Sequence, residues 1–320
     1  LLVLLLQKGK NVRAIFRSQE SIKKAEKVFH ALGMERLFSE IEWVEADITD
    51  FFSLSDVFQD IQEVYHAAAM VSLDSRDSSQ MMKVNVEGTA NMVNLSLTNS
   101  IQKFCFVSSI AALGEYDQKC TDEEAIWQKT EHTSNYSISK YYAENEVWRA
   151  SEEGLNVCIV NPATIIGFGD WEESSSTIIK RVFEGLNFYP PGKNGFVAVE
   201  DVTHAMFQLM EDKVFGERFI LVSENWPFQQ LLSTIAEALN RKGPKYKASK
   251  WLALILLRLD QIRGIFAPSK VLLTPEKIRT AFSERCYSAE KIRKSLGFDF
   301  TPLEFSIQKS AGQYLEQNGL

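Results

Sequence analysis

The chain has 320 residues and a formal net charge of −7, with 45% hydrophobic and 24% charged residues. This composition is typical of a soluble globular protein, and the length allows one large α/β domain or a core domain with a smaller lobe. The negative charge argues against a nucleic-acid-binding surface.

Two apolar runs, at 1–6 and 251–257, are well short of the roughly 18 residues that a membrane-spanning helix needs. The first run also lacks the basic leader and small-residue cleavage site of a signal peptide. The cysteines are widely separated and form no Cys-x-x-Cys pair: Cys105, Cys120, Cys158 and Cys286. We therefore expect a cytoplasmic protein with reduced thiols, no disulfide, no zinc site and no membrane span.

Strand and helix patterns alternate through the first half of the chain. Strands are expected at 11–16, 41–45, 63–66, 103–107 and 156–160, and helices at 19–32, 54–60, 78–100 and 136–151. This alternation predicts an α/β fold of the Rossmann type, a doubly wound parallel sheet. Ligands in such folds lie beyond the carboxyl ends of the strands, where polar and small residues follow each predicted strand here.

The composition changes after Gly169, where irregular glycine and proline residues and shorter helical patterns begin. We predict a dinucleotide-binding domain at 1–169 and, at 170–320, mainly a smaller C-terminal substrate-binding lobe that partly returns to the sheet. The chain opens inside an amphipathic helix, so we expect that native residues before Leu1 are absent.

The motif Asn-Tyr-Ser-Ile-Ser-Lys at 135–140 places Tyr136 and Lys140 at i and i+4 of a predicted helix, on one face. An ammonium beside a phenol favours the phenolate and lowers the tyrosine pKa, which would suit proton transfer near neutral pH. A second Tyr-x-x-x-Lys, from Tyr246 to Lys250, shows that the spacing alone is weak evidence.

Several residues after predicted strands have both a functional and a structural interpretation. Ser109 could donate to a substrate oxygen, or it could bond its own turn. Arg17 could pair with a phosphate or be a solvated arginine. Asp47 could accept from a nucleobase amine or cap the next helix.

Ala67, Ala68 and Ala69 permit close approach of an extended ligand, and equally tight helix packing. Asn85 lies inside a predicted helix, where asparagine is unfavourable, and this indicates a bend or an inward hydrogen bond. The four histidines show no metal-ligand spacing and are expected to be structural: His30, His66, His132 and His204. Apolar residues on two helices exceed what one sheet face needs and favour a homodimer interface over core: Met81, Met82, Met92, Tyr142 and Trp148.

Taken together, the motifs resemble the extended short-chain dehydrogenase/reductases. The similarity is greatest to the branch with dihydroflavonol 4-reductases, cinnamoyl-CoA reductases and 3β-hydroxysteroid dehydrogenases. The matching pieces are Tyr136-x-x-x-Lys140, Ser108-Ser109-x-x-x-x-Gly114, Asn85-Val86-x-Gly88-Thr89, Ala46-Asp47-Ile48, Asn161-Pro162-Ala163-x-x-x-Gly167 and the late run from Tyr287 to Phe298.

The resemblance implies that Tyr136 is the proton donor or acceptor, that Lys140 orients the nicotinamide ribose, and that Ser109 steadies the carbonyl oxygen. Arg17 matches the position that holds the 2′-phosphate, which favours NADP, with NAD also compatible. The expected cofactor-binding residues are Arg17, Asp47, Ile48, Ala67, Ala68, Ala69, Asn85, Ser108, Lys140, Asn161 and Pro162. Family members begin with a strand and a Gly-x-x-Gly-x-x-Gly turn, which we expect before Leu1.

The predicted function is an NAD(P)-dependent oxidoreductase that passes hydride between nicotinamide and a carbonyl or secondary alcohol of a small, hydrophobic substrate. A nucleotide-sugar epimerase or dehydratase is the alternative within the same chemistry. A cofactor-binding sensor or scaffold without catalysis is the alternative of another class. No metal is expected, and the expected partners are a small-molecule substrate and a second copy of the chain.

Overall fold

The computed structural model describes residues 1–72, 74–114, 119–131, 133–172, 174–251, 253–255, 257–258 and 274–320. Four parallel strands form the main sheet in the order β3-β4-β5-β9: β3 (Glu63–His66), β4 (Lys103–Val107), β5 (Val157–Pro162) and β9 (Glu217–Leu221). A separate parallel pair consists of β1 (Arg13–Phe16) and β2 (Glu42–Glu45). These parallel strands and their connecting helices confirm the predicted doubly wound α/β fold.

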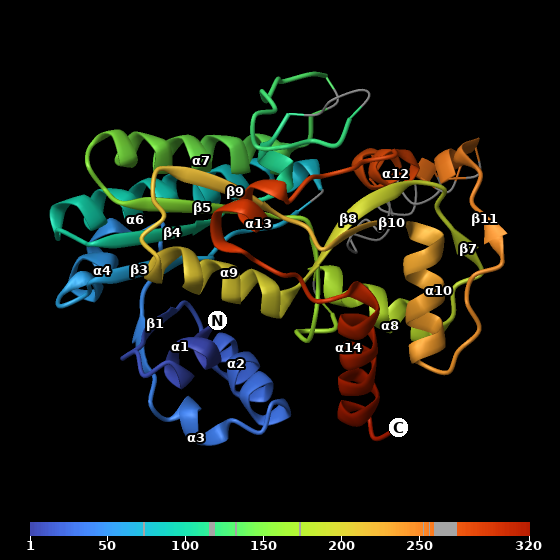
Figure 1. Cartoon of the computed structure of the whole chain (residues 1–320), viewed down its shortest axis with the longest axis horizontal. Coiled ribbons are helices and arrows are strands. Elements are labelled where there is room, and N and C mark those ends of the chain that lie inside the picture. The colour runs from blue at the N-terminus through green and yellow to red at the C-terminus, as the bar shows by residue number, and fades with distance from the viewer. Residues whose placement is uncertain are drawn as a thin grey trace.

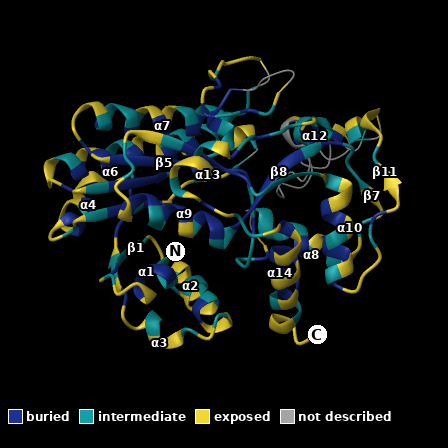
Figure 2. Cartoon of the chain, viewed as in Figure 1, coloured by how far each residue is buried: buried dark blue, intermediate teal, exposed yellow. Residues whose placement is uncertain are grey.

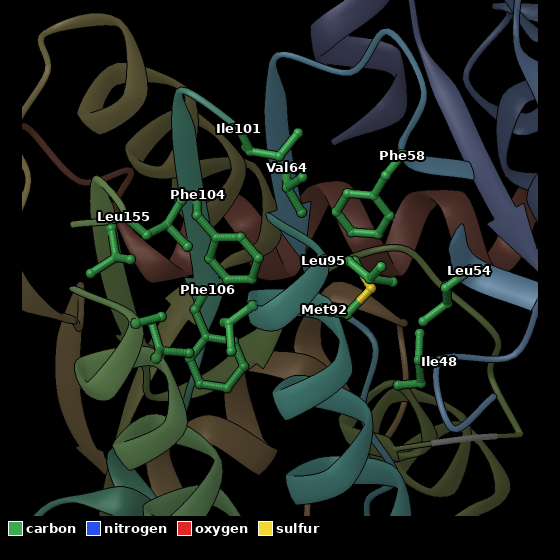
Figure 3. Close-up of a cluster of buried hydrophobic side chains, with 14 of the residues drawn as sticks. Ile48, Leu54, Phe58, Val64, Met92, Leu95, Ile101, Phe104, Phe106 and Leu155 are labelled. Atoms are coloured by element: carbon green, nitrogen blue, oxygen red, sulfur yellow. The ribbon is translucent and has the colours of Figure 1, made fainter. Parts of the chain in front are cut away.

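Helices cover both faces of the main sheet (Figure 1). On one face lie α6 (Gly88–Thr98) and α7 (Asn135–Glu152), and α9 (Val199–Glu211) packs on the other. Alternation along β4 explains the two layers, because Phe104 and Phe106 enter the cluster under α6 and α7 while Cys105 enters the cluster under α9. Figure 3 shows the two phenylalanines side by side in that first cluster.

Five further helices belong to the N-terminal part of the chain. These are α1 (Leu2–Gln7), α2 (Gln19–Ala31), α3 (Glu35–Phe38), α4 (Phe51–Ser55) and α5 (Ser78–Met82). Leu5, Val12 and Phe29 form a small core of their own there. Figure 2 shows the corresponding pattern, with buried residues along the strands and exposed residues on the outer helix faces.

The second lobe is built on a three-stranded sheet of order β10-β8-β6, from β6 (Thr164–Ile166), β8 (Lys193–Ala198) and β10 (Glu224–Pro227). Its apolar core joins α8 (Thr177–Glu184), α10 (Phe228–Ala238) and α14 (Leu303–Gln317) around buried Phe196 and Leu303. The other strands and α-helices of the described residues are β7 (Phe188–Tyr189), β11 (Tyr246–Lys247), α12 (Pro275–Phe282) and α13 (Glu290–Leu296). The chain returns to the main sheet through α9 and β9.

The segment predicted as one helix at 78–100 is interrupted. α5 runs into a π-helical turn at Lys83–Glu87, and α6 begins at Gly88. A Cβ added at Gly88 would lie 2.7 Å from Ile48 Cδ1, so only glycine lets α6 approach the turn after β2 this closely. Such π-turns often accompany functional sites.

The apolar surplus on the two helices is mainly core. Met81 and Met92 are buried, and Trp148 packs, partly buried, against the cluster that contains Met92. The prediction that these residues favour an interface is wrong for Met81 and Met92, because helical periodicity does not show how deeply the sheet and α7 enclose a face. Tyr142 is exposed.

Among the helices that the structure describes, none is long and apolar enough to cross a membrane.

A disulfide joins Cys120 and Cys286, with Cα atoms 4.5 Å apart and a sequence separation of 166. The prediction of four reduced thiols is therefore wrong for this pair, while Cys105 and Cys158 are free and buried. Beside the disulfide, Thr121 N donates to Cys286 O at 2.8 Å and Ser288 N donates to Thr121 O at 2.9 Å. The cross-link ties the loop before α7 to the C-terminal region.

Replacing Cys120 by serine should lower the free energy of unfolding by about 2–4 kcal/mol, because the cross-link restricts a long loop in the unfolded chain. Urea unfolding with and without a thiol reductant measures this. The reductant should destabilise the wild-type protein and leave Cys120→Ser unchanged. Equal unfolding midpoints under all four conditions would contradict the prediction.

Candidate active site

Ser109 and Tyr136 meet at the carboxyl end of β4. Ser109 caps the short 3₁₀ turn Ile110–Ala112, where its Oγ accepts from Ala111 N at 3.1 Å, and its side chain also hydrogen-bonds the Tyr136 side chain. The structural interpretation of Ser109 is confirmed, since the hydroxyl serves its own turn. The same hydroxyl faces the phenol, and donation to a substrate oxygen stays a prediction. A hydroxyl pair of this kind can bind one carbonyl oxygen from two sides.

The first turn of α7 fixes the position of Tyr136. Ser134 caps the helix, and its Oγ accepts from Ser137 N at 2.9 Å. Ser137 Oγ donates to Ala111 O at 2.6 Å, which joins the helix start to the Ser109 turn. Trp127 Nε1 donates to Ser137 Oγ at 3.1 Å, and the Trp127 ring stacks on Tyr141 with centroids 4.0 Å apart.

Lys140 is buried one helical turn after Tyr136. Its Nζ donates to Val107 O at 2.7 Å and lies 4.7 Å from the centroid of the Phe106 ring. Burial lowers the pKa of Lys140 to about 8, and the negative charge of Glu144 opposes this shift. The ammonium is thus held at the end of β4.

The expected lowering of the Tyr136 pKa is not what this structure shows. Burial raises the pKa of Tyr136, and the hydrogen bond with Ser109 only partly offsets this. The i, i+4 spacing places two Cβ atoms on one helix face, but it does not fix where a long lysine side chain directs its ammonium. Here that ammonium is bonded to Val107 O.

Asn85 braces the site from inside the π-helical turn. Its Oδ1 accepts from Met70 N at 2.7 Å, and its Nδ2 donates to Met70 O at 2.9 Å and to Ser139 Oγ at 2.9 Å. Ser139 Oγ in turn donates to Tyr136 O at 2.8 Å. The predicted bend and the predicted inward hydrogen bond are both present, and they connect the chain after β3 to the helix of Tyr136.

The histidines fit a structural role as far as they are described. His66 is buried, with Nε2 2.9 Å from Thr89 Oγ1, and burial together with the charge of Lys140 lowers its pKa to about 3. His30 Nε2 is 3.8 Å from Glu35 Oε1 at the surface. His132 lies outside the described residues. Within the part of the chain that is described, no cluster of residues suited to a metal ion occurs.

Arg17 and Asp47 follow the neighbouring strands β1 and β2, with Arg17 Nη1 3.9 Å from Asp47 Oδ2. The Arg17 side chain is 69% exposed, so its guanidinium is accessible to a ligand. Asp47 Oδ1 accepts from Thr49 N and Thr49 Oγ1, both at 2.8 Å. Burial pushes the pKa of Asp47 up, but these bonds and the charge of Arg17 outweigh burial and lower it. Asp47 does not cap the next helix, because that residue is Asp50.

Ala67, Ala68 and Ala69 follow β3 and are exposed, whereas residues of the sheet beside them are buried. Ile48 is buried under Gly88, and its carbonyl accepts from Asn91 Nδ2 at 2.9 Å. Exposed small residues at strand ends, an accessible arginine and an aspartate form a donor and acceptor set that fits an extended dinucleotide.

Ser108, Asn161 and Pro162 were expected to touch the cofactor, and all three are buried. Ser108 Oγ donates to Glu144 Oε2 at 2.6 Å, and Asn161 Nδ2 donates to Glu144 Oε2 at 2.9 Å and to Ser109 O at 3.0 Å. The Ser108 and Asn161 side chains therefore hold the buried residues behind the site rather than facing a ligand. Sequence reasoning missed Glu144 and Arg218, although Glu144 lies one turn after Lys140 on the same predicted helix.

Tyr246 and Lys250, the second Tyr-x-x-x-Lys, are exposed. Tyr246 lies in the short strand β11 and its ring is 5.7 Å from Phe188. β11 pairs with β7 in a sheet separate from the main one, which agrees with their interpretation as surface residues.

Comparison with known proteins agrees with this arrangement. The model of the NAD dependent epimerase/dehydratase family matches residues 1–221. The chain belongs to this family. It is an NAD(P)-dependent oxidoreductase of the short-chain dehydrogenase/reductase class, as the motifs predicted.

Relatives match over most of their length. "Sterol demethylase protein B" of Methylococcus capsulatus is 27% identical over 300 residues, covering 92% of this chain and 87% of the relative. A "putative dihydroflavonol 4-reductase" of Synechocystis sp. is 26% identical over 302 residues, covering 92% and 84%. The yeast methylglyoxal/isovaleraldehyde reductase Gre2, solved with NADPH, superposes with a TM-score of 0.75 at 23% identity, covering 99% of this chain and 95% of that one. This last likeness shows the fold.

The depressed pKa of Lys140 predicts how stability depends on pH. Its pKa is near 10.5 when unfolded and about 8 when folded, so the unfolded chain binds the extra proton between these values. The free energy of unfolding should therefore rise between pH 8 and 9.5, by about 1–2 kcal/mol relative to Lys140→Met. Urea titrations of both proteins at matched pH values test this. Parallel pH curves for the two proteins would refute it.

Proposed function

We propose that this protein transfers hydride between NADP and a carbonyl or secondary alcohol of a hydrophobic small molecule. The observation that carries the proposal is the hydroxyl pair of Ser109 and Tyr136 at the end of β4, with buried Lys140 one turn away. The cofactor supplies or accepts the hydride. The chain supplies a proton donor, a donor for the developing oxyanion and a fixed cation.

In the direction of reduction, Tyr136 Oη gives its proton to the carbonyl oxygen of the substrate while Ser109 Oγ donates a hydrogen bond to the same oxygen. A tyrosine whose pKa is raised by burial is protonated at neutral pH, which is the form that a proton donor needs. We infer that the Lys140 ammonium, bonded here to Val107 O, turns toward the phenolate that remains and stabilises it during the reaction. Asn85 holds the backbone on which Tyr136 stands.

Arg17 supports NADP over NAD. It is accessible at the carboxyl end of β1, and a guanidinium offers a planar set of donors to a 2′-phosphate. The structurally similar yeast reductase was solved with NADPH. We infer that Asp47, beside Arg17, accepts from the adenine amine.

A hydrophobic substrate is supported by the names of the similar proteins, which include a sterol demethylase protein, a dihydroflavonol reductase and cinnamoyl-CoA reductases. In the substrate lobe, Phe196 and Trp171 are buried in its core, whereas Phe188 and Trp251 are exposed. Only the exposed pair is therefore available to a ligand.

Nucleotide-sugar epimerisation remains the second candidate within the family, and tightly retained NAD with no net cofactor consumption would favour it. The homodimer and the cytoplasmic location stay predictions from the sequence.

Tyr136→Phe should lower turnover by at least about 100-fold, because it removes the proton donor while preserving the ring. NADPH-dependent reduction of a panel of aldehydes and ketones, followed at the cofactor absorbance band, measures the rate. Cofactor affinity by fluorescence titration should change little. Tyr246→Phe is the matched control, since it makes the same substitution in the second Tyr-x-x-x-Lys and should keep full activity. Full activity of Tyr136→Phe would rule out the proposed mechanism.

Arg17→Ala should weaken NADPH binding by about 10–100-fold and leave NADH binding nearly unchanged, because a charge-assisted hydrogen bond is worth about 1.5–3 kcal/mol. Titration of both cofactors against the wild-type protein and the variant gives the selectivity ratio. Arg36→Ala, another exposed arginine, serves as the control. An unchanged ratio in Arg17→Ala would mean that NADP selectivity has another source.

A further inference from the structure

We propose that Glu144 is a positioning residue of this site. Its carboxylate, on α7, binds the Ser108–Ser109 turn, the end of β5 and strand β9. It also supplies the negative charge that Lys140 faces in the core. That Glu144 assists catalysis rests on the proposed function. Its effect on Lys140 can be measured without any substrate.

The carboxylate of Glu144 is buried and fully engaged. Oε2 accepts from Ser108 Oγ at 2.6 Å and from Asn161 Nδ2 at 2.9 Å. Oε1 accepts from Arg218 Nη1 at 3.1 Å and from Trp148 Nε1 at 3.3 Å. An ionised carboxylate accepts at both oxygens, so all these donors are satisfied at once, which a neutral glutamine cannot do.

Arg218 extends the hydrogen-bond network of Glu144 to the loop before α7. The salt bridge between Arg218 and Glu144 is largely buried, with Glu144 only 3% exposed. Arg218 Nε also donates to Glu123 O at 3.0 Å, and Glu123 Oε1 accepts from Ile220 N at 2.8 Å. The loop that leads into the catalytic helix is therefore attached to β9 through the same charge pair.

The groups that face Lys140 leave Glu144 as its source of negative charge. On β3, His66 is neutral because burial lowers its pKa to about 3. On β4, Lys140 meets only the Phe106 ring and Val107 O. On α7, Tyr136 is a neutral phenol at physiological pH, and Glu144 follows one turn later on the same buried face. Arg218 stands beyond Glu144 and adds positive charge.

This arrangement affects the reaction through the charge of Lys140. With a pKa of about 8, the side chain is mostly protonated at neutral pH, and a fall of about one unit would leave about half of it neutral. A neutral amine would no longer stabilise the Tyr136 phenolate. Asn161 adds a geometric link, since its amide bonds both Glu144 and the carbonyl of Ser109.

The test measures the pKa of Lys140 by NMR in the whole chain labelled with ¹³C at lysine Cε, without cofactor or substrate. The Lys140 signal is assigned by its absence in Lys140→Met. In Glu144→Gln we expect the pKa of Lys140 to fall by about one unit, the size typical for loss of a nearby opposite charge. Glu146→Gln makes the same change two residues away, in a surface pair with Arg149, and should leave the Lys140 pKa unchanged. An unchanged Lys140 pKa in Glu144→Gln overturns the proposal.

Glu144→Asp keeps the test decisive if Glu144→Gln does not fold. It retains the negative charge, so the Lys140 pKa should stay within about half a unit of the wild-type value even though thermal stability falls. A drop of a full unit in Glu144→Asp would mean that the packing around Glu144, and not its charge, sets the Lys140 pKa, and would overturn the assignment. Because no turnover is measured, failure here is distinct from failure of the proposed reaction.

Discussion

The ammonium of Lys140 lies in the protein core, against the Phe106 ring and the Val107 carbonyl. A buried cation is costly unless other groups compensate for the lost water, and much of the architecture around the site serves this need. The end of β4 provides a carbonyl, α7 provides Glu144, and burial of His66 removes the proton that would otherwise repel the lysine. Function and stability oppose each other at this residue, since the charge that would assist Tyr136 is the one that burial disfavours.

The compensation draws on three neighbouring strands. Ser109 follows the carboxyl end of β4 and Asn161 lies near the carboxyl end of β5, whereas Arg218 lies near the amino end of β9, opposite Ile159, and reaches Glu144 on α7. The π-helical turn before α6 adds Asn85, which donates to Ser139 on α7. Each residue has a partner on a different element, so movement of any one element would leave a buried polar group unsatisfied.

The second lobe is coupled to this edge by covalent and polar links rather than by a continuous sheet. The disulfide between Cys120 and Cys286 and the bridge between Thr121 and Tyr287 join the loop before α7 to the C-terminal region. Lys24 on α2 and Asp170 after β6 form a salt bridge with atoms 2.9 Å apart, so the N-terminal helices also contact the chain that enters the lobe.

The sequence by itself determined the alternating α/β pattern and the succession of strands and helices in the first half of the chain, and it predicted Tyr136, Lys140, Ser109 and Asn85 as site residues. These depend on local periodicity, spacing and turn chemistry, which are properties of neighbouring residues. Only the tertiary structure decided the Cys120–Cys286 disulfide, the burial of Met81, the direction of the Lys140 ammonium and the network around Glu144. Each of these depends on contacts between residues far apart in the chain, and on a dielectric environment that exists only once the sheet and its helices have closed around them.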